Sequence, residues 1–236
     1  MIGILVILAI SWVLLYFIEK KHLNVLGVTP FYLRVKQFTI GFLLAGLLCV
    51  VAQMLEIWIK SADLVLVEGA GFSKVLNGLW WDFKSVLTEE LLFRGAILFI
   101  LIRRIGHKAA IHLSAAAFGV YHWFSYGVFG NPVPMVLIFI GTGLMGFAWA
   151  LSFHKTKSIM LGLGFHLGWN FVYNTIFSKG PLGKGFLFIE GGNPLSDWAS
   201  LINFLVPMIG VPLVIILFVL RGVKPSDYHT LQNPDQ

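Results

Sequence analysis

Long apolar stretches alternate with short polar loops along the chain, and this pattern limits the fold more than any other feature. Several of these stretches approach or exceed the ~20 residues that a helix needs to cross a bilayer. Charged residues make up 12% of the 236 residues, which is about half of their share in a typical soluble domain. The sequence therefore predicts an all-α fold, a polytopic transmembrane helix bundle with the lipid bilayer as its partner.

Seven apolar stretches are candidate spans of one integral-membrane domain that covers residues 1–236. The first stretch has no basic segment before it and no convincing cleavage site, so we expect a retained span rather than a signal peptide. Residues 60–78 are ambiguous, because Glu68-Gly69-Ala70-Gly71 breaks a short apolar run. They form either an interfacial segment or an eighth span, so seven to eight spans are predicted. The seven are residues 1–18, 37–59, 79–102, 109–128, 134–153, 158–177 and 198–220.

Lysine and arginine are distributed unevenly between the alternating loops. If the N-terminus lies outside, the inner loops hold eleven of these residues and the outer loops hold four. Cytoplasmic loops are enriched in Lys and Arg, so we predict a multi-pass protein of the cell membrane with its N-terminus outside. The net charge of +6 then reflects topology, and no nucleic-acid partner is expected. The inner set consists of residues 19–37, 103–108, 154–157 and the segment after residue 220.

Three charged residues lie within six positions of one another, in the middle of the predicted span at residues 79–102. A charge near the bilayer centre costs at least about 2.5–3.5 kcal/mol on insertion scales. Glu90 and Arg94 are spaced i, i+4 with the glutamate first, which favours an ion pair along a helix. Glu89 is rotated about 100° from Glu90 and has no such partner. The stretch is either a functional site with Glu89 as its candidate base or a charge cluster that only holds helices together.

Histidine and asparagine side chains lie in two other predicted spans. His122 lies in the fourth span, and His166 and Asn170 share one face of the sixth. Counted from the nearest basic residue of an inner loop, Glu89 and His122 are each fourteen residues along their helices, and Asn170 is thirteen. At ~1.5 Å per residue these three lie about 20 Å from one membrane face, with His166 about one turn lower. Each residue alone is equally typical of a hydrogen bond between packed helices, but their common depth indicates one site.

Three further patterns concern packing rather than chemistry. Trp80-Trp81-Asp82 is typical of an aromatic anchor at the membrane interface, where the acidic helix begins. Gly164 and Gly168 form a small-xxx-small pattern, which lets a neighbouring helix approach closely. Cys49 is the single cysteine and lies in an apolar run, so we interpret it as a buried apolar residue rather than a nucleophile.

Three kinds of chemistry fit a glutamate, two histidines and an asparagine in one layer. The first is hydrolysis, in which Glu89, aided by His122, takes a proton from water. His166 and Asn170 would then donate hydrogen bonds to an oxyanion. The second is a metal site, although the HExxH zinc motif is absent, and the third is a proton relay in a transporter. We expect no cofactor, the residues alone leave the metal site open, and no motif supports a Ser or Cys nucleophile.

Three motifs follow one another on three predicted spans: Glu89-Glu90-x-x-x-Arg94, Phe118-x-x-x-His122 and His166-x-x-x-Asn170. In order and spacing they resemble those of the CPBP intramembrane proteases. This family comprises the type II CAAX prenyl endopeptidases and the bacteriocin-processing or Abi-type membrane proteins. The resemblance covers about residues 88–170, within a motif-bearing core at about residues 79–178. It implies a glutamate-dependent endopeptidase that hydrolyses peptide bonds within the membrane without a metal.

The resemblance also implies a role for each matching residue. On the family's pattern, Glu89 and His122 activate the water, and His166 with Asn170 forms the oxyanion hole. Glu90 and Arg94 would support the site. The implied substrates are membrane-associated peptides or proteins, prenylated or not. The alternative is a non-catalytic membrane partner, such as a bacteriocin-immunity protein, that keeps the protease fold.

Overall fold

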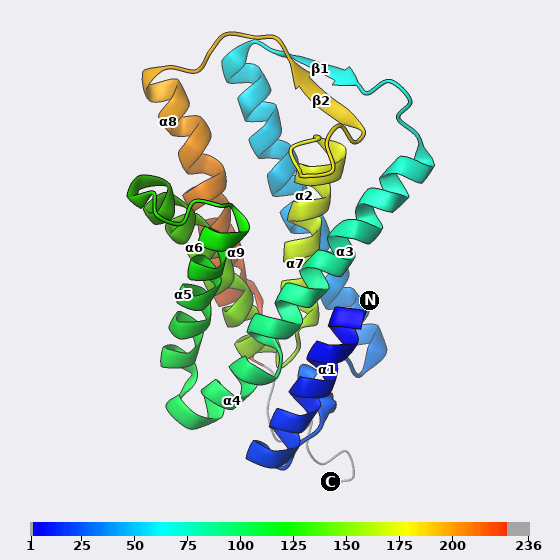
Figure 1. Cartoon of the computed structure of the whole chain (residues 1–236), viewed down its shortest axis with the longest axis vertical. Coiled ribbons are helices and arrows are strands. Elements are labelled where there is room, and N and C mark those ends of the chain that lie inside the picture. The colour runs from blue at the N-terminus through cyan, green and yellow to red at the C-terminus, as the bar shows by residue number, and fades with distance from the viewer. Residues whose placement is uncertain (1, 226–236) are drawn as a thin grey trace.

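A computed structural model describes residues 2–225, which form a helix bundle with a two-stranded sheet at one end (Figure 1). Short π-helical or 3-10 segments, labelled η, continue or connect several helices. The elements are α1 (Ile2–Leu14), η1 (Leu15–Glu19), η2 (Leu23–Leu26), α2 (Phe31–Lys60), β1 (Asp63–Leu66), α3 (Phe72–Arg94), α4 (Ala96–Ile105), α5 (His107–Ser125), α6 (Pro132–Thr156), α7 (Met160–Asn170), η3 (Phe171–Ile176), β2 (Leu187–Glu190), α8 (Asp197–Leu205), η4 (Val206–Gly210) and α9 (Val211–Gly222).

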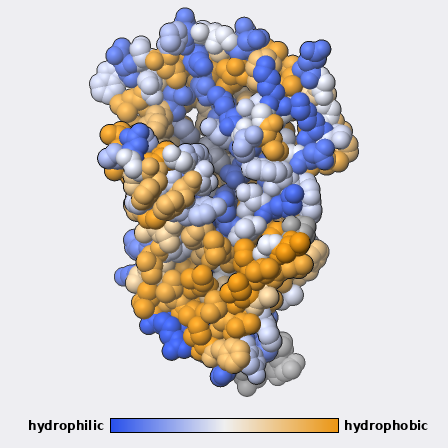
Figure 2. Space-filling model, viewed as in Figure 1, coloured by the Kyte–Doolittle hydropathy of each residue, from blue (hydrophilic) through white to orange (hydrophobic). Residues whose placement is uncertain are grey.

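Long apolar helices make this a membrane bundle, as the sequence predicts. Within residues 2–225, four helical segments are long and apolar enough to cross a membrane. Figure 2 shows hydrophobic residues gathered in a broad band on one face, with hydrophilic residues between this band and the end that carries the sheet. The all-α fold class is confirmed, whereas crossings by α3, α5 and α7 stay a prediction. The four segments are Ile2–Glu19, Phe31–Lys60, Pro132–Thr156 and Asp197–Gly222.

The predicted third span is two helices rather than one. α3 ends at Arg94 and α4 begins at Ala96. Gly95 between them has φ −83° and ψ −131°, which is outside the helical region. A Cβ atom at Gly95 would lie 2.2 Å from the carbonyl oxygen of Leu91, so this bend requires glycine. The expectation of a continuous helix over residues 79–102 is therefore wrong, and the break lies directly after the charged residues.

Residues 61–71 form a strand and a turn rather than an eighth span. α2 ends where Ser61 adopts a left-handed conformation with φ 51°. β1 then pairs antiparallel with β2, with Asp63 opposite Glu190 at the start of the register. The apolar run is too short for a membrane helix, and its valines favour a strand. The eighth-span alternative is therefore wrong, and two loops predicted on the outer face lie side by side.

α2 and α7 pack against each other through glycine residues. A Cβ atom at Gly168 would lie 2.2 Å from the carbonyl oxygen of Phe42. A Cβ atom at Gly164 would lie 2.2 Å from that of Phe38, and one at Gly41 would clash with the backbone of α7. The close approach predicted from the small-xxx-small pattern is confirmed. This packing positions α7, which carries the third motif.

Loops of the predicted inner set meet at one end of the bundle. Glu19 forms ion pairs with Arg103 and Arg104, at 2.7 Å and 2.8 Å. Arg34 donates a hydrogen bond to the carbonyl oxygen of Thr156 at 3.0 Å. These contacts join three segments of the inner set. Loops that were predicted to lie on one side of the membrane therefore lie at one end of the bundle. Which end faces the cytoplasm stays a prediction.

Candidate active site

One stripe of α3 carries ionisable residues into the interior of the bundle. Gly78, Asp82, Val86, Glu90 and Arg94 are all buried and follow one another at intervals of four residues. This spacing places them along one face of a helix. Partners of this stripe come from α7 and η3. Because three of its five residues are ionisable, these partners determine what the stripe can do.

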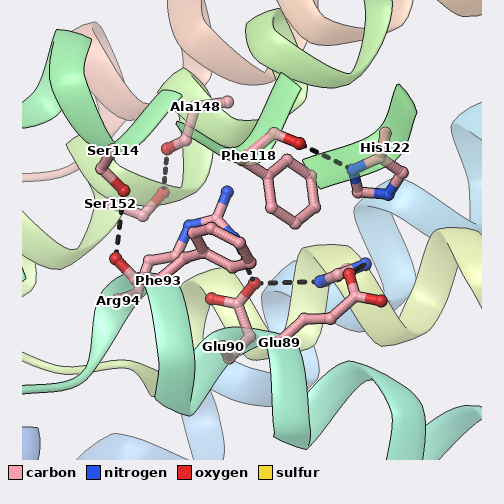
Figure 3. A network of polar contacts seen from close by, with 10 residues as sticks. Glu89, Glu90, Phe93, Arg94, Ser114, Phe118, His122, Ala148 and Ser152 are labelled. Carbon is pink, nitrogen blue, oxygen red and sulfur yellow. Dashed lines mark hydrogen bonds and ion pairs between the residues drawn. The ribbon is translucent and has the colours of Figure 1, made fainter. Parts of the chain in front are cut away.

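Glu90 lies at the centre of a buried polar network (Figure 3). Its Oε1 atom accepts a hydrogen bond from Nδ1 of His166 at 2.9 Å and lies 3.4 Å from Nη1 of Arg94. The side chains of Glu90 and Arg94 are both fully buried, so each charge depends on the other for compensation. The ion pair predicted from the i, i+4 spacing is present, and Glu90 in addition fixes a histidine of α7.

Aromatic rings enclose the Arg94 guanidinium. Its Cζ atom lies 4.1 Å from the centre of the Phe118 ring and 5.0 Å from that of the Trp149 ring. Both distances are within the ~6 Å at which a ring face attracts a cation. Gly146 leaves room for this group, because a Cβ atom there would lie 2.9 Å from Nη2 of Arg94. The guanidinium nitrogens have no hydrogen-bond partner among residues 2–225, so Glu90 and the rings hold this cation.

Glu89 faces a cavity instead of the buried pair. Its side chain is 14% exposed, whereas that of Glu90 is fully buried. Its Oε2 atom lies 3.7 Å from Nε2 of His166 and has no hydrogen-bond partner in the described part of the chain. Neighbouring residues of a helix point in different directions, so the side chains of the two adjacent glutamates enter different surroundings. One is paired with arginine, and the other is available to a ligand.

The His166 ring is held on three sides. Nδ1 donates to Glu90 at 2.9 Å, and Nε2 lies 3.7 Å from Glu89. The Trp149 ring of α6 stacks on the imidazole with centroids 3.9 Å apart and an interplanar angle of 16°. These contacts leave the ring little freedom to rotate. Trp149 is a part of the site that the sequence analysis did not single out.

His122 is oriented by its own helix. Its Nδ1 atom lies 2.8 Å from the carbonyl oxygen of Phe118, one turn earlier in α5. A carbonyl oxygen only accepts hydrogen bonds, so Nδ1 is the donor. The neutral ring then carries a lone pair on Nε2. The Phe118 ring contacts His122 edge-on with centroids 4.3 Å apart, so the same residue orients His122 and covers Arg94.

A cavity of about 910 Å³ joins the candidate residues. Its volume is at the upper end of the ~300–1,000 Å³ that is usual for ligand sites. The Asn170 side chain is partly buried and makes no hydrogen bond with another described residue, so its amide is available to a ligand. Four of the six candidate residues line this cavity, and the Glu90–Arg94 pair lies behind its wall. The four are Glu89, His122, His166 and Asn170.

The metal alternative requires both histidines and a carboxylate to converge on one point. Within residues 2–225, no three His, Cys, Asp or Glu side chains are grouped so that they could bind a metal ion. Nδ1 of His122 bonds its own backbone, and Nδ1 of His166 bonds Glu90. The described side chains are thus arranged as hydrogen-bonded acid and base groups around a cavity.

Comparison with known families gives one match. The family model "Type II CAAX prenyl endopeptidase Rce1-like" matches residues 71–172. This segment is therefore similar to the Rce1-like family. The match runs from the residue before α3 to the second residue of η3 and contains all three motifs, so the predicted resemblance to the CPBP proteases is confirmed. No match was found among curated proteins or among solved structures.

The Rce1-like segment contains all six candidate residues, but it does not build the cavity alone. Gln53 and Glu56 of α2 line the cavity from one side, and Phe204 and Met208 of α8 and η4 line it from another. These walls lie outside the matched residues. The family match therefore supports a membrane protease, while the shape of the cavity depends on parts of the chain that the match does not cover.

Asp82 is a residue of the Rce1-like segment that the sequence analysis did not assign to the site. Its helix, α3, begins at Phe72 rather than near Trp80, and the Asp82 side chain is fully buried. Its carboxylate accepts hydrogen bonds from Asn174 at 2.6 Å and from Thr175 at 3.0 Å. Both partners lie in η3, a π-helical turn directly after α7, and such turns are frequent at functional sites. Asp82 lies two steps of four residues before Glu90 in the sequence. This spacing could have placed it on the same buried stripe of the helix.

Proposed function

We propose that this protein is a multi-pass, CAAX-type endopeptidase of the cell membrane that hydrolyses peptide bonds in the 910 Å³ cavity. One observation carries the proposal. Glu89, His122, His166 and Asn170, from three helices of the Rce1-like segment, line the same cavity. A carboxylate with no hydrogen-bond partner, a neutral imidazole and an unbonded amide are the groups that water activation and oxyanion binding require.

Glu89 is the proposed general base, with His122 as its aid. The Glu89 side chain lines the cavity, and its buried Oε2 atom has no hydrogen-bond partner among the described residues, so the carboxylate is placed to take a proton from a water molecule. Nε2 of His122 carries a lone pair and accepts a second hydrogen bond from the same water. The water oxygen then attacks the carbonyl carbon of the peptide bond. The proton held by Glu89 is later donated to the leaving amine.

His166 and Asn170 are the proposed donors to the oxyanion. The Asn170 amide donates an N–H directly, and His166 donates from Nε2 when both ring nitrogens carry hydrogen. Two carboxylates flank His166, and one of them is paired with Arg94. Two negative and two positive charges then balance within the cluster. Glu90 and Arg94 therefore act by positioning His166 and by holding this balance, without touching the substrate.

The proposed substrates are membrane-associated peptides or proteins. The cavity contains apolar walls, including Ile138, Met145 and Trp169, beside its polar groups. Such walls suit an apolar peptide segment or a prenyl chain next to the peptide bond that is cleaved. The family description supports prenylated CAAX tails as the first class to test.

Exchange of Glu89 for Gln is the first test of this function. Full-length protein in proteoliposomes is incubated with a farnesylated CAAX peptide and, separately, with a library of unprenylated membrane peptides. Mass spectrometry measures the cleavage products. We expect Glu89→Gln to lower the cleavage rate about 100-fold or more, because a positioned general base contributes ~10²–10⁴-fold. The variant should retain the yield and thermal stability of the wild type, since Glu89 has no buried ion-pair partner of its own in α3.

Glu68→Gln is the matched control, because it makes the same chemical change at an exposed position between β1 and α3. It should leave cleavage unchanged. Equal loss in both variants, or full activity in Glu89→Gln, would contradict the role of Glu89 as base. A cellular phenotype that persists in Glu89→Gln at normal expression would favour a non-catalytic role.

Chelation tests whether the hydrolysis uses a metal. We expect cleavage to persist within about twofold after exhaustive treatment with a chelator, because the proposed proton transfers use only side chains of the chain. Elemental analysis of the same sample measures residual metal. Loss of activity that a divalent metal restores would replace this mechanism with a metal-activated water.

A further inference from the structure

A second cavity lies at the end of the bundle where the loops of the predicted inner set meet. Its volume is about 210 Å³. The loop before α2 forms one wall, the end of α6 forms another, and Phe99 and Ile102 of α4 complete it. It shares no lining residue with the 910 Å³ cavity, so the proposed peptidase function does not use it.

Arg34 is the buried cation of this second cavity. Its side chain is 1% exposed. Nε donates to the carbonyl oxygen of Thr29 at 3.0 Å, and Nη1 donates to Gln37 and to the carbonyl oxygen of Thr156. Nη2 has no hydrogen-bond partner among residues 2–225, and no carboxylate in that range forms an ion pair with this guanidinium. Burial of an uncompensated cation is unfavourable, so the geometry indicates that an anion completes the site.

The remaining charges around the cavity have the same sign. Lys21 and Lys157 line it together with Arg34, and none of the described lining residues is acidic. The imidazole of His154 lines it as well. Nδ1 of His154 is buried without a hydrogen-bond partner in residues 2–225. The nearby carboxylate of Glu19 is already paired with two arginines of α4. The cavity is therefore a basic pocket in which Nη2 of Arg34 is a buried donor without a partner among residues 2–225.

We propose that this pocket binds a phosphate group. A planar guanidinium with a free nitrogen suits phosphate oxygens, and the lysines supply further positive charge. The volume is below the ~300–1,000 Å³ of sites for drug-sized ligands, so it suits a headgroup and excludes larger molecules. Basic pockets between membrane helices on the cytoplasmic side bind anionic lipid headgroups. The phosphate group belongs either to such a lipid or to a free phosphate.

The bound group would also act on the structure. Arg34 links the start of α2 to the end of α6 through its bond to Thr156, and Lys21 belongs to the loop that follows η1. A phosphate between them neutralises cations that otherwise repel one another. Binding should therefore raise the thermal stability of the whole bundle. This effect requires no peptidase activity.

Thermal denaturation of the full-length protein in a neutral detergent tests the proposal. Three probes are titrated separately: phosphatidylglycerol, phosphatidylcholine and inorganic phosphate. We expect a saturable rise of the melting temperature with phosphatidylglycerol that exceeds the rise with phosphatidylcholine. Native mass spectrometry should detect one retained anionic lipid. A saturable rise with inorganic phosphate alone would assign the site to a soluble phosphate. No saturable rise with any of the three probes would overturn the proposal.

Lys21→Gln and Lys36→Gln form a matched pair of variants. Lys21 lines the pocket, whereas Lys36 is exposed on α2 and lines neither cavity. Loss of one basic residue near a phosphate should weaken binding about fivefold. We expect this weakening for Lys21→Gln and none for Lys36→Gln. Equal effects of the two variants would show that the lipid responds only to net charge, and this result would reject a built site.

Arg34→Lys examines the guanidinium itself. It keeps the charge but loses the planar group that bonds Thr29 and Thr156. We expect weaker phosphatidylglycerol binding than in Lys21→Gln. If this variant does not fold, the Lys21 and Lys36 pair still decides the proposal, because the Lys21 side chain makes no hydrogen bond or ion pair with another described residue.

Discussion

At the scale of single residues, the Glu90–Arg94 pair links stability to the site. We expect Arg94→Ala to lower the free energy of unfolding by about 3–5 kcal/mol, because it leaves Glu90 buried without its counter-charge. His166 would lose its fixed position as a consequence, so cleavage should also fall. Yield from the membrane and thermal denaturation measure the first effect. A variant with normal yield and stability would contradict the ion-pair assignment.

Arg103→Ala is the control for this prediction. Arg103 also pairs with a glutamate, Glu19, at 2.7 Å, but its side chain is 42% exposed, and Glu19 keeps a second partner in Arg104. Exposed ion pairs contribute about 0–1 kcal/mol. We therefore expect little change in stability. The comparison separates the effect of burial from the effect of losing any arginine.

Local rules predict some residues of the site and not others. The ion pair of Glu90 with Arg94 follows from an i, i+4 rule within one helix, and the common depth of the polar residues follows from helical rise. Trp149 could not be recognised, because its contact with His166 joins two helices and the chain has eight tryptophans with no local feature to distinguish them. Asp82 was not assigned to the site for the same reason, since its partners come from η3.

At the scale of elements, glycine contacts between α2 and α7 set the position of the third motif. We expect Gly168→Ala to destabilise the bundle by about 1–3 kcal/mol, because the added methyl group would overlap the carbonyl oxygen of Phe42 and force the helices apart. The shift would also move Asn170 relative to α3. Thermal denaturation and the cleavage assay measure the two effects.

Gly143→Ala provides the comparison within another apolar helix. The nearest atom to an added Cβ there, outside its own helix turn, is the carbonyl oxygen of Ala115 at 3.6 Å, which is an ordinary contact distance. Because alanine favours a helix over glycine by up to about 1 kcal/mol, stability should be unchanged or higher. Equal destabilisation by the two substitutions would refute the close-packing explanation for α7.

Hydropathy predicts the helices but not their interruptions. The break at Gly95 depends on a close approach to Leu91, and an isolated glycine within an apolar run is otherwise tolerated in a helix. The π-helical turn η3 is bonded to Asp82 on another helix, so no local pattern announces it. The pairing of β1 with β2 joins segments far apart in the sequence. The π-helical turn and the strand pairing are set by tertiary contacts that one sequence does not reveal.

At the scale of the whole molecule, the predicted inner loops and the predicted outer loops lie at opposite ends of the bundle. The 910 Å³ cavity lies between the two ends. The sheet and the loop that contains β2 lie at one end (Figure 1). Glu56 near that end pairs with Lys179 at 2.9 Å, and both residues line the 910 Å³ cavity. The basic pocket lies among the loops at the other end. If the basic loops are cytoplasmic, the proposed peptidase site lies nearer the outer face.

Cysteine labelling tests this orientation of the whole molecule. Cys49 is the single cysteine and is buried, so a Cys49→Ala background carries no competing thiol. We expect a membrane-impermeant maleimide to label a Ser196→Cys variant in intact cells, because Ser196 is exposed before α8 in a predicted outer loop. A Val28→Cys variant, exposed in a predicted inner loop, should react only after permeabilisation. The reverse pattern would place the basic loops outside, and labelling of both sites in intact cells would contradict the alternation of the loops across the membrane.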